Sequence, residues 1–320
     1  MNERWRRALG WRIDRRVRWG VGAALLVVVL VQVGGGGGGV LDLLGTADLA
    51  IALPAIAGLV AVHLLGAATW RLLQSRVSGW APAWPATIRT YYVAQGIGGL
   101  TPANFGSDVY RVAAVRGQLA WSDAALPIVL QRVVSSAALA ALGVVGLALL
   151  STRMPAVVWM AGSTAIVLVV AAAAVSVARR RAISVRPATP SNGVGMWTVT
   201  LVSAFALGLA FHAVSLALAL AIVASISPVA APLPILGALA VARLSLLVPL
   251  TPSGLGVQEG LLAVLFVGVG QPADVAIAAS LLARLSLLAT TLMGAGLLVS
   301  RRSARFAPSG PQAGGDVLPG

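Results

Sequence analysis

Two stretches decide the fold of this chain: LTPANFGSD, Leu100–Asp108, and LTPSGLGVQE, Leu250–Glu259. In each, a Thr-Pro pair is followed by a glycine four residues after the proline, and then by one carboxylate. Proline removes a backbone donor and clashes with the preceding turn, so neither motif can continue a regular helix. Paired Gly/Pro-interrupted segments in matching halves of a membrane protein indicate a substrate site between two broken helices. We therefore expect a membrane protein with an internal repeat.

The composition around the motifs supports this expectation. Hydrophobic residues make up 58% of the 320 residues and charged residues 10%, with a mean hydropathy of +0.92. Soluble domains carry about 25% charged residues, so a soluble domain of any size is excluded. The net charge of +14 comes from arginines beside apolar runs, which indicates topology signals and contacts with anionic headgroups rather than a nucleic-acid surface. There is no cysteine, which excludes disulfides and thiol chemistry.

A membrane span needs about 20 apolar residues. Six stretches qualify: 19–40, 49–73, 124–150, 155–178, 197–225 and 274–299. The two motif regions, 88–108 and 233–269, are broken by proline and glycine, and non-helical backbone at membrane depth is tolerated only inside protein or along a wet cavity. The predicted fold is all-α and integral to the membrane, with six full transmembrane helices plus two re-entrant helical hairpins.

This count places the arginine clusters on one face. The clusters are Arg4–Arg18, then Arg71, Arg76, Arg111 and Arg116, then Arg179–Arg186, then Arg301–Arg305. The positive-inside rule then predicts a multi-pass inner-membrane protein with both termini cytoplasmic. Three spans between the motifs invert the second copy, which predicts an inverted repeat of about 49–150 and 197–299.

Three segments are expected: a basic cytoplasmic arm, 1–18, a membrane domain, 19–300, and a disordered cytoplasmic tail, 301–320. At the mouth of the first hairpin we expect an interfacial aromatic belt. Its residues are Trp80, Trp84, Tyr91 and Tyr92.

Both motif regions resemble a known family. TYYVAQGIGGLTPANFGSDVYR, Thr90–Arg111, and LLVPLTPSGLGVQEG, Leu246–Gly260, resemble the two signatures of the lysylphosphatidylglycerol synthase transmembrane-region family. That family includes the flippase half of the bacterial multiple peptide resistance factor. The departures replace one small residue by another, as in Ala94-Gln95 for the usual Gly-Gln. The resemblance implies lipid translocation. We expect no lysyl transfer, because only about twenty residues follow the last span and leave no room for a synthase domain.

The charged residues of the apolar regions are the main site candidates. A charge at bilayer depth costs roughly 2.5–3.5 kcal/mol. Arg132 and Arg284 lie at matching places after the two motifs, and we expect them, with Arg243, to pair with Asp108 and Glu259 and leave net positive charge for a lipid phosphate.

Alternatives to these roles stay open. The carboxylates could cap helices, and the arginines could form structural ion pairs or extend to the membrane surface. Arg111 could complete the first signature or be an ordinary positive-inside residue.

Smaller polar groups complete the candidate substrate contacts. They are Gln95, Thr101, Gly106, Thr251, Gly254 and Gly256. The glycines would allow tight hairpins with N–H groups facing an anion, or close helix packing. The threonines could line a cavity or bond back to their own helix. His63 and His212 lack a second ligand at metal spacing, so neither a metal site nor a cofactor is predicted.

The leading prediction is a flippase-like membrane translocator of an anionic phospholipid or lipid-linked headgroup. We expect it not to be an enzyme. We also expect that ATP does not drive it, because no P-loop occurs. Its expected partner is membrane phospholipid and not nucleic acid, and no feature sets an oligomeric state. One alternative is an integral membrane enzyme acting on a lipid or polyprenyl phosphate, with Asp108 or Glu259 as base. Another is a membrane subunit that anchors a separate lipid-modifying enzyme.

Overall fold

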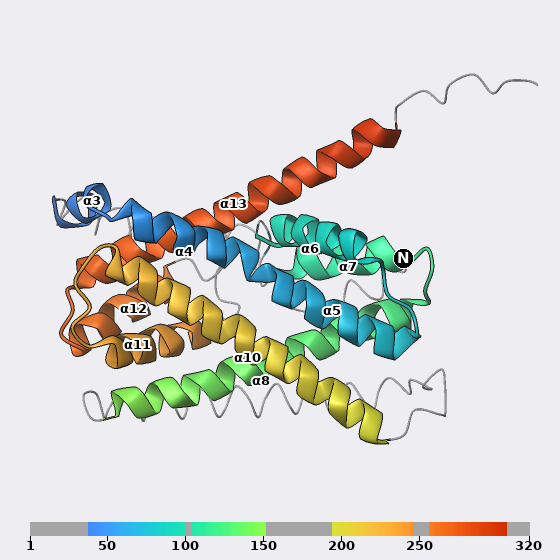
Figure 1. The fold of residues 1–320 in the computed structure, drawn as a ribbon, viewed down its shortest axis with the longest axis horizontal. Coiled ribbons are helices and arrows are strands. Elements are labelled where there is room, and N and C mark those ends of the chain that lie inside the picture. The colour runs from blue at the N-terminus through green and yellow to red at the C-terminus, as the bar shows by residue number, and fades with distance from the viewer. Residues whose placement is uncertain (1–37, 100, 102–103, 152–193, 246–255, 306–320) are drawn as a thin grey trace, which may run out of the picture.

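The computed structural model describes residues 38–99, 101, 104–151, 194–245 and 256–305, which form helices and contain no strand (Figure 1). Four of their helical stretches are long and apolar enough to cross a membrane. They are Leu49–Ser78, Trp121–Leu150, Met196–Ala224 and Ala273–Ser300. These stretches coincide with four of the six expected spans, and the described residues are all-α as expected. The expected spans 19–40 and 155–178, and the arm 1–18, lie almost wholly outside the described residues.

The long helices run roughly along one axis, in two opposite directions. A short helix α3 (Gly38–Gly45) precedes α4 (Leu49–Ala61), which passes at Val62 into α5 (His63–Ser78). The remaining long helices are α8 (Trp121–Leu150), α10 (Val194–Ala224) and α13 (Ala273–Arg305). Figure 1 shows α4, α5 and α13 running one way and α8 and α10 the other. We call the end beside α3 the α3 end, and the end where α5 finishes the α5 end.

Local sequence explains where several of these helices begin and end. The carboxylate of Asp48 accepts a hydrogen bond from the N–H of Ala50 at 2.8 Å and caps α4. Gly79 ends α5 with a left-handed φ of 70°, a conformation that glycine adopts without steric cost. Pro232 opens helix α11 (Pro232–Leu244), where its missing N–H would have had no helical partner.

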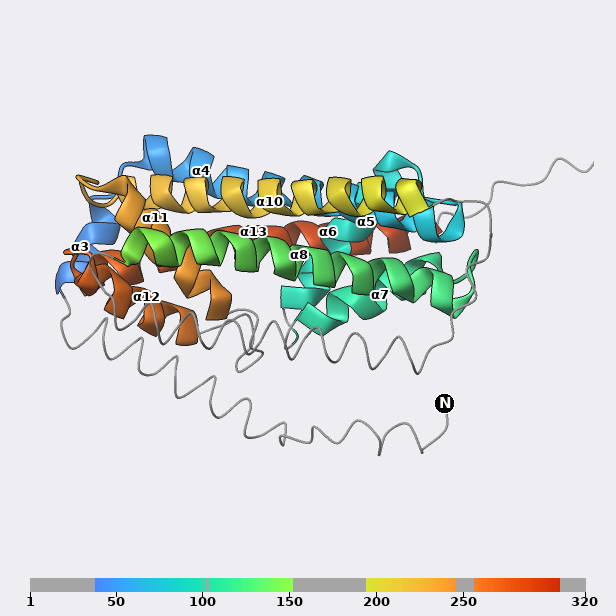
Figure 2. The same ribbon diagram turned by 90° about the horizontal axis from the view of Figure 1, so that it is seen from below.

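Two pairs of shorter helices occupy opposite halves of the bundle. α6 (Trp84–Gly99) and α7 (Phe105–Val115) form an antiparallel pair in the half next to the α5 end. α11 (Pro232–Leu244) and α12 (Val257–Gly268) form a second pair in the half next to the α3 end (Figure 2). Each pair starts at its own end of the bundle, runs toward the middle and returns.

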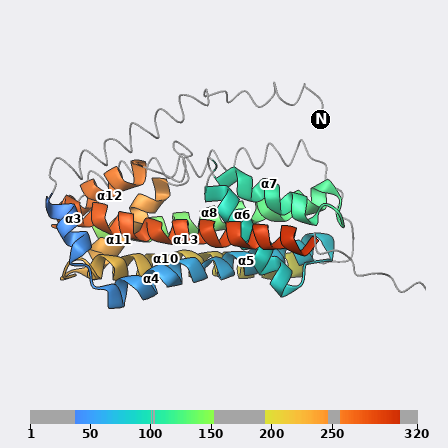
Figure 3. The ribbon, with the colours of Figure 1, turned by 90° about the horizontal axis from the view of Figure 1, so that it is seen from above.

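The first helix of each pair packs against a long helix from the other half of the chain. Figure 3 shows α6 beside α13. α6 lies along α13, where Gly96 and Gly294 face each other so closely that a Cβ on Gly96 would lie 3.3 Å from the Cα of Gly294. α11 lies along α8, where a Cβ on Gly146 would lie 2.9 Å from the carbonyl oxygen of Gly237. Glycines thus allow backbone contact at both crossings.

Two expectations need correction. Tyr91 and Tyr92 are each 5% exposed and face α4 and α5, where the Tyr92 hydroxyl donates to the carbonyl oxygen of Val60 at 2.8 Å. They belong to the protein interior and not to a lipid-facing aromatic belt. The expected disordered tail 301–320 also starts too early, because α13 continues to Arg305. No proline interrupts that stretch before position 308.

Candidate functional site

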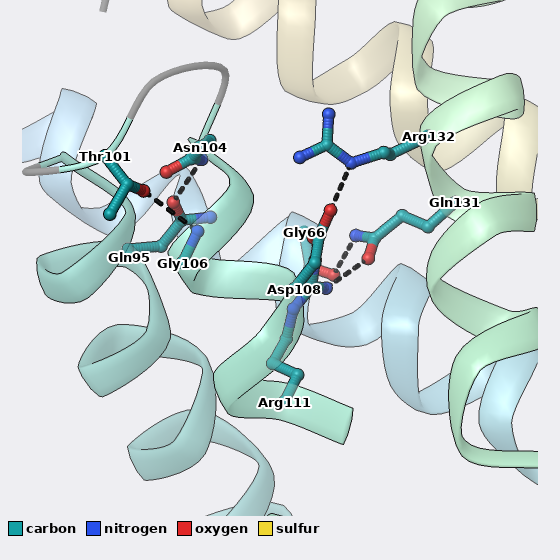
Figure 4. Close-up of polar contacts among 9 residues, drawn as sticks. All are labelled: Gly66, Gln95, Thr101, Asn104, Gly106, Asp108, Arg111, Gln131 and Arg132. Carbon is teal, nitrogen blue, oxygen red and sulfur yellow. Dashed lines mark hydrogen bonds and ion pairs between the residues drawn. The ribbon is translucent and has the colours of Figure 1, made fainter. Parts of the chain in front are cut away.

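Thr101 organises the turn of the first helix pair (Figure 4). Its hydroxyl donates to the carbonyl oxygen of Gly98 at 3.0 Å and accepts from the N–H of Gly106 at 2.9 Å. Asn104, in a left-handed conformation with φ 57°, donates from Nδ2 to Oε1 of Gln95 at 3.0 Å. Thr101 therefore bonds back to its own hairpin, and the Gly106 N–H is used within the protein.

Asp108 joins two arginines in the first turn of α7 (Figure 4). Its Oδ1 accepts from Nη2 of Arg111 at 2.6 Å, and its Oδ2 forms an ion pair with Nε of Arg132 on α8. The side chains of Asp108 and Arg111 are 15% and 6% exposed, whereas that of Arg132 is 46% exposed. The expected pairing with Arg132 is present, and the two oxygens face guanidinium groups rather than the N–H groups that a helix cap would use. We call these three residues the Arg-Asp-Arg cluster.

Arg111 is held from several sides inside the bundle. Its Nη1 donates to Oε1 of Gln131 at 2.6 Å, and the amide of Gln131 donates in turn to the carbonyl oxygen of Gly66 at 2.8 Å. The guanidinium carbon lies 5.8 Å from the ring of Trp70 and 5.3 Å from that of Tyr91, within cation–π range. The interpretation of Arg111 as an ordinary positive-inside residue is therefore wrong.

Glu259 and Arg284 form a second centre, between α12 and α13. Nε of Arg284 donates to Oε1 of Glu259 at 2.6 Å, and Nη2 of the same arginine contacts the same oxygen. Oε2 accepts from the N–H of Gly256 at 2.7 Å, so Glu259 caps α12 as well as pairing with an arginine. Gly256 has φ 81°, which favours glycine. The Glu259 side chain is 4% exposed, and each positive charge here is matched by a negative one.

Arg243 lies apart from both acids. Its Nη2 donates to the carbonyl oxygen of Ser215 at 3.1 Å, and among the described residues no carboxylate is within ion-pair distance of it. The expected pairing of Arg243 with an acid is therefore not found, because the last turn of α11 directs this side chain toward α10. His212 lies 3.1 Å from the hydroxyl of Ser135, and His63 packs among aromatic rings.

Some candidates cannot be placed in this arrangement. Thr251, Gly254 and the second motif's proline lie in 246–255, and the first motif's proline lies in 102–103. Both ranges are outside the described residues. Within the described part of the chain, no group of three or more His, Asp or Glu side chains could hold a metal ion. Sequence reasoning missed Gln131, because its partners Arg111 and Gly66 are distant along the chain. It also missed Asn104, because its contact with Gln95 depends on the turn between α6 and α7. The three-residue spacing of Asp108 and Arg111 was the available signal for their contact.

Comparison with protein families gives a match over most of the chain. The sequence model of a family described as "Lysylphosphatidylglycerol synthase TM region" matches residues 17–294, which include both helix pairs and both arginine–acid centres. No curated protein matches the chain.

Proposed function

Because this chain belongs to the family of lysylphosphatidylglycerol synthase TM regions, we propose that it is a flippase-like translocator. It moves the headgroup of an anionic phospholipid, or a lipid-linked headgroup, between the leaflets of the cell membrane. The lipid leaves chemically unchanged, so the protein is a transporter rather than an enzyme. Four long apolar helices and the family membership support the membrane setting.

We further propose six spans and two re-entrant hairpins, with the α5 end and both termini cytoplasmic. The charges near the two ends support this orientation. Arg71, Arg76 and Arg116 belong to the helix ends and turns at the α5 end, whereas Asp42 and Asp48 lie at the α3 end. Cytoplasmic loops carry an excess of arginine and lysine. The helix pairs α6–α7 and α11–α12 would then enter the membrane from opposite sides.

The Arg-Asp-Arg cluster is the observation that carries the proposal. Two guanidinium groups share one carboxylate there, so the three side chains together carry a net charge of +1 among apolar helices. A charge at that depth is costly, and it is compensated when an anion binds. A guanidinium fork also matches the geometry of phosphate.

Within the cluster, Arg132 is the residue best placed to contact a phosphate. Its side chain is 46% exposed, and Figure 4 shows its terminal nitrogens directed away from Asp108. Asp108 stays paired with Arg111 when Arg132 turns to a ligand, so no buried carboxylate loses all its partners. In contrast, Arg284 is directed at Glu259 through two of its nitrogens.

The acyl chains would remain in the bilayer while the headgroup crosses a polar path between the two hairpins. The turn of the first hairpin supplies polar side chains beside that path, among them Gln95, Asn104 and Thr101. The sequence contains no P-loop, so we propose that transport is driven by a lipid gradient or an ion gradient.

The test uses purified protein in vesicles that contain fluorescently labelled phosphatidylglycerol. Accessibility of the label to a membrane-impermeant reductant measures transfer between leaflets. We expect Arg132→Gln to reduce the transfer rate at least about tenfold, because a hydrogen bond to a charged group contributes about 1.5–3 kcal/mol. Arg116→Gln is the matched control, since Arg116 is exposed at the end of α7 and should transfer lipid like wild type.

Two results would overturn the proposal. One is equal transfer by wild type, Arg132→Gln and empty vesicles. The other is a chemically changed lipid, seen by mass spectrometry of the recovered phosphatidylglycerol, which would identify an enzyme.

A further inference from the structure

A groove of about 560 Å³ lies between the beginning of α6 and the end of α7, within the first helix pair at the α5 end. The groove is separate from the Arg-Asp-Arg cluster, because no residue of that cluster lines it. We propose that this groove is a surface docking site for the headgroup of an anionic phospholipid from the adjacent leaflet. The volume is within the range of small-molecule sites, about 300–1,000 Å³.

The charge of the lining favours an anion. Arg89 is the charged residue among the groove's lining residues, which include no carboxylate. Its Nη2 donates to the carbonyl oxygen of Leu297 at 2.8 Å and to the hydroxyl of Ser300 at 3.2 Å, which fixes the guanidinium on the groove wall. Thr90, Tyr110 and Gln118 line the same groove and offer hydroxyl and amide donors. A fixed guanidinium beside neutral donors is a suitable setting for a phosphate.

A second arginine holds the segment just before α6. Nε of Arg71 donates to the carbonyl oxygen of Pro82 at 3.0 Å, and its guanidinium carbon lies 4.8 Å from the ring of Trp84. Pro82 lines the groove, so Arg71 both holds this segment and adds positive charge beside it. The attraction for an anionic surface therefore comes from two arginines on α5 and α6.

The aromatic residues at this end place the groove at headgroup depth. Trp80 lines the groove, and Trp84 and Trp121 are 47% and 65% exposed. Tryptophan side chains gather where a membrane meets water, because one edge of the ring is polar and its body is apolar. The groove lies among them, at the level where phospholipid phosphates are found.

A phospholipid fits better than a free phosphate because exposed apolar side chains lie on α7 next to Tyr110, a residue that lines the groove. Val109 and Phe105 lie on α7 beside and beyond Tyr110, toward the middle of the bundle, and are 52% and 65% exposed. A headgroup in the groove would therefore extend its acyl chains along this exposed side of α7. Free phosphate would gain no binding free energy from these side chains, because they contribute by burying apolar surface and phosphate has none.

The experiment measures adducts of phosphatidylglycerol and phosphatidylcholine on the full-length protein by native mass spectrometry from a neutral detergent. Ala114 lines the groove and is exposed, so Ala114→Trp should fill it. We expect Ala114→Trp and Arg89→Gln each to weaken phosphatidylglycerol binding about tenfold. Ala113→Trp, at the neighbouring exposed position outside the groove, is the control and should bind like wild type.

The outcomes separate this site from the proposed transport function. Arg132→Gln should lose transport and keep phosphatidylglycerol binding at the groove, because Arg132 is not part of the lining. Four results would overturn the docking site: equal binding of phosphatidylcholine, unchanged binding in both Arg89→Gln and Ala114→Trp, equal weakening by Ala113→Trp, or inorganic phosphate competing at the affinity of the lipid. Circular dichroism of each variant checks that it is folded.

Discussion

The two arginine–acid centres differ in how their charges are used. Asp108 is shared by a buried and a half-exposed arginine, whereas Glu259 is 4% exposed and has both oxygens occupied within the protein. We therefore propose the anion contact for the first centre only. The second centre, in contrast, joins the start of α12 to α13. Matching positions after the two sequence motifs need not carry matching roles.

We predict that Glu259→Gln lowers stability. The change leaves Arg284 without its carboxylate, and breaking a largely buried ion pair costs about 3–5 kcal/mol. Thermal unfolding of the purified protein in detergent measures the effect. Asp42→Asn is the control, because this exposed carboxylate makes no ion pair among the described residues and its loss should leave unfolding unchanged. Normal unfolding of Glu259→Gln with lost transport would instead assign Glu259 to the substrate path.

At the scale of helices, the close crossings of α6 with α13 and of α11 with α8 depend on glycine. Gly294 is buried, and a Cβ there would lie 2.6 Å from the carbonyl oxygen of Tyr92 and 3.2 Å from the Cα of Gly96. Those neighbours are backbone atoms in helices, so the helices themselves would have to separate. The apolar core that surrounds α11 at the α3 end, with Phe266 and Ile235 fully buried, holds the other crossing.

Gly294→Ala should therefore destabilise the protein by about 1–3 kcal/mol, the usual cost of overpacking. Gly296→Ala, two residues later on the same helix, meets no atom within 4 Å and should be neutral, or more stable by up to about 1 kcal/mol. Thermal unfolding of the two variants side by side gives the comparison. Equal melting temperatures for both would show that α6 and α13 do not cross this closely.

The broken helices, and the pairing of Asp108 with Arg132 and of Glu259 with Arg284, were predictable from the sequence for identifiable reasons. Proline and glycine mark a broken helix locally, and a lone arginine in an apolar helix needs an acid nearby. The surroundings of Arg111 were not predictable, because Gln131 and Trp70 come from α8 and α5 and meet it only after packing. Tyr91 was misassigned because an aromatic residue looks the same in sequence whether it faces lipid or a neighbouring helix.

The whole molecule is arranged as two helix pairs that start at opposite ends of one bundle (Figure 1). The proposed topology gives these ends different sides of the membrane. The natural chain has no cysteine, so each introduced cysteine would be the single thiol in the protein. Orientation can therefore be tested position by position.

We predict that cysteines at Ala83 and Gly117, which flank α6 and α7, react with an impermeant maleimide from the cytoplasmic side. Cysteines at Ala230 and Gln271, which flank α11 and α12, should react from the opposite side. Labelling of intact cells and of inverted membrane vesicles distinguishes the two sides. If one cysteine of a flanking pair reacts from the cytoplasmic side and the other from the opposite side, that helix pair crosses the membrane instead of returning.

The crossing of α6 with α13 has a consequence for biosynthesis. Gly96 leaves the ribosome about two hundred residues before Gly294, the backbone against which it rests. At translation speeds of about 5–20 residues per second, the first hairpin waits roughly 10–40 s for its partner. During that interval its glycine face and the polar turn at Thr101 must be accommodated by the insertion machinery or by other nascent helices.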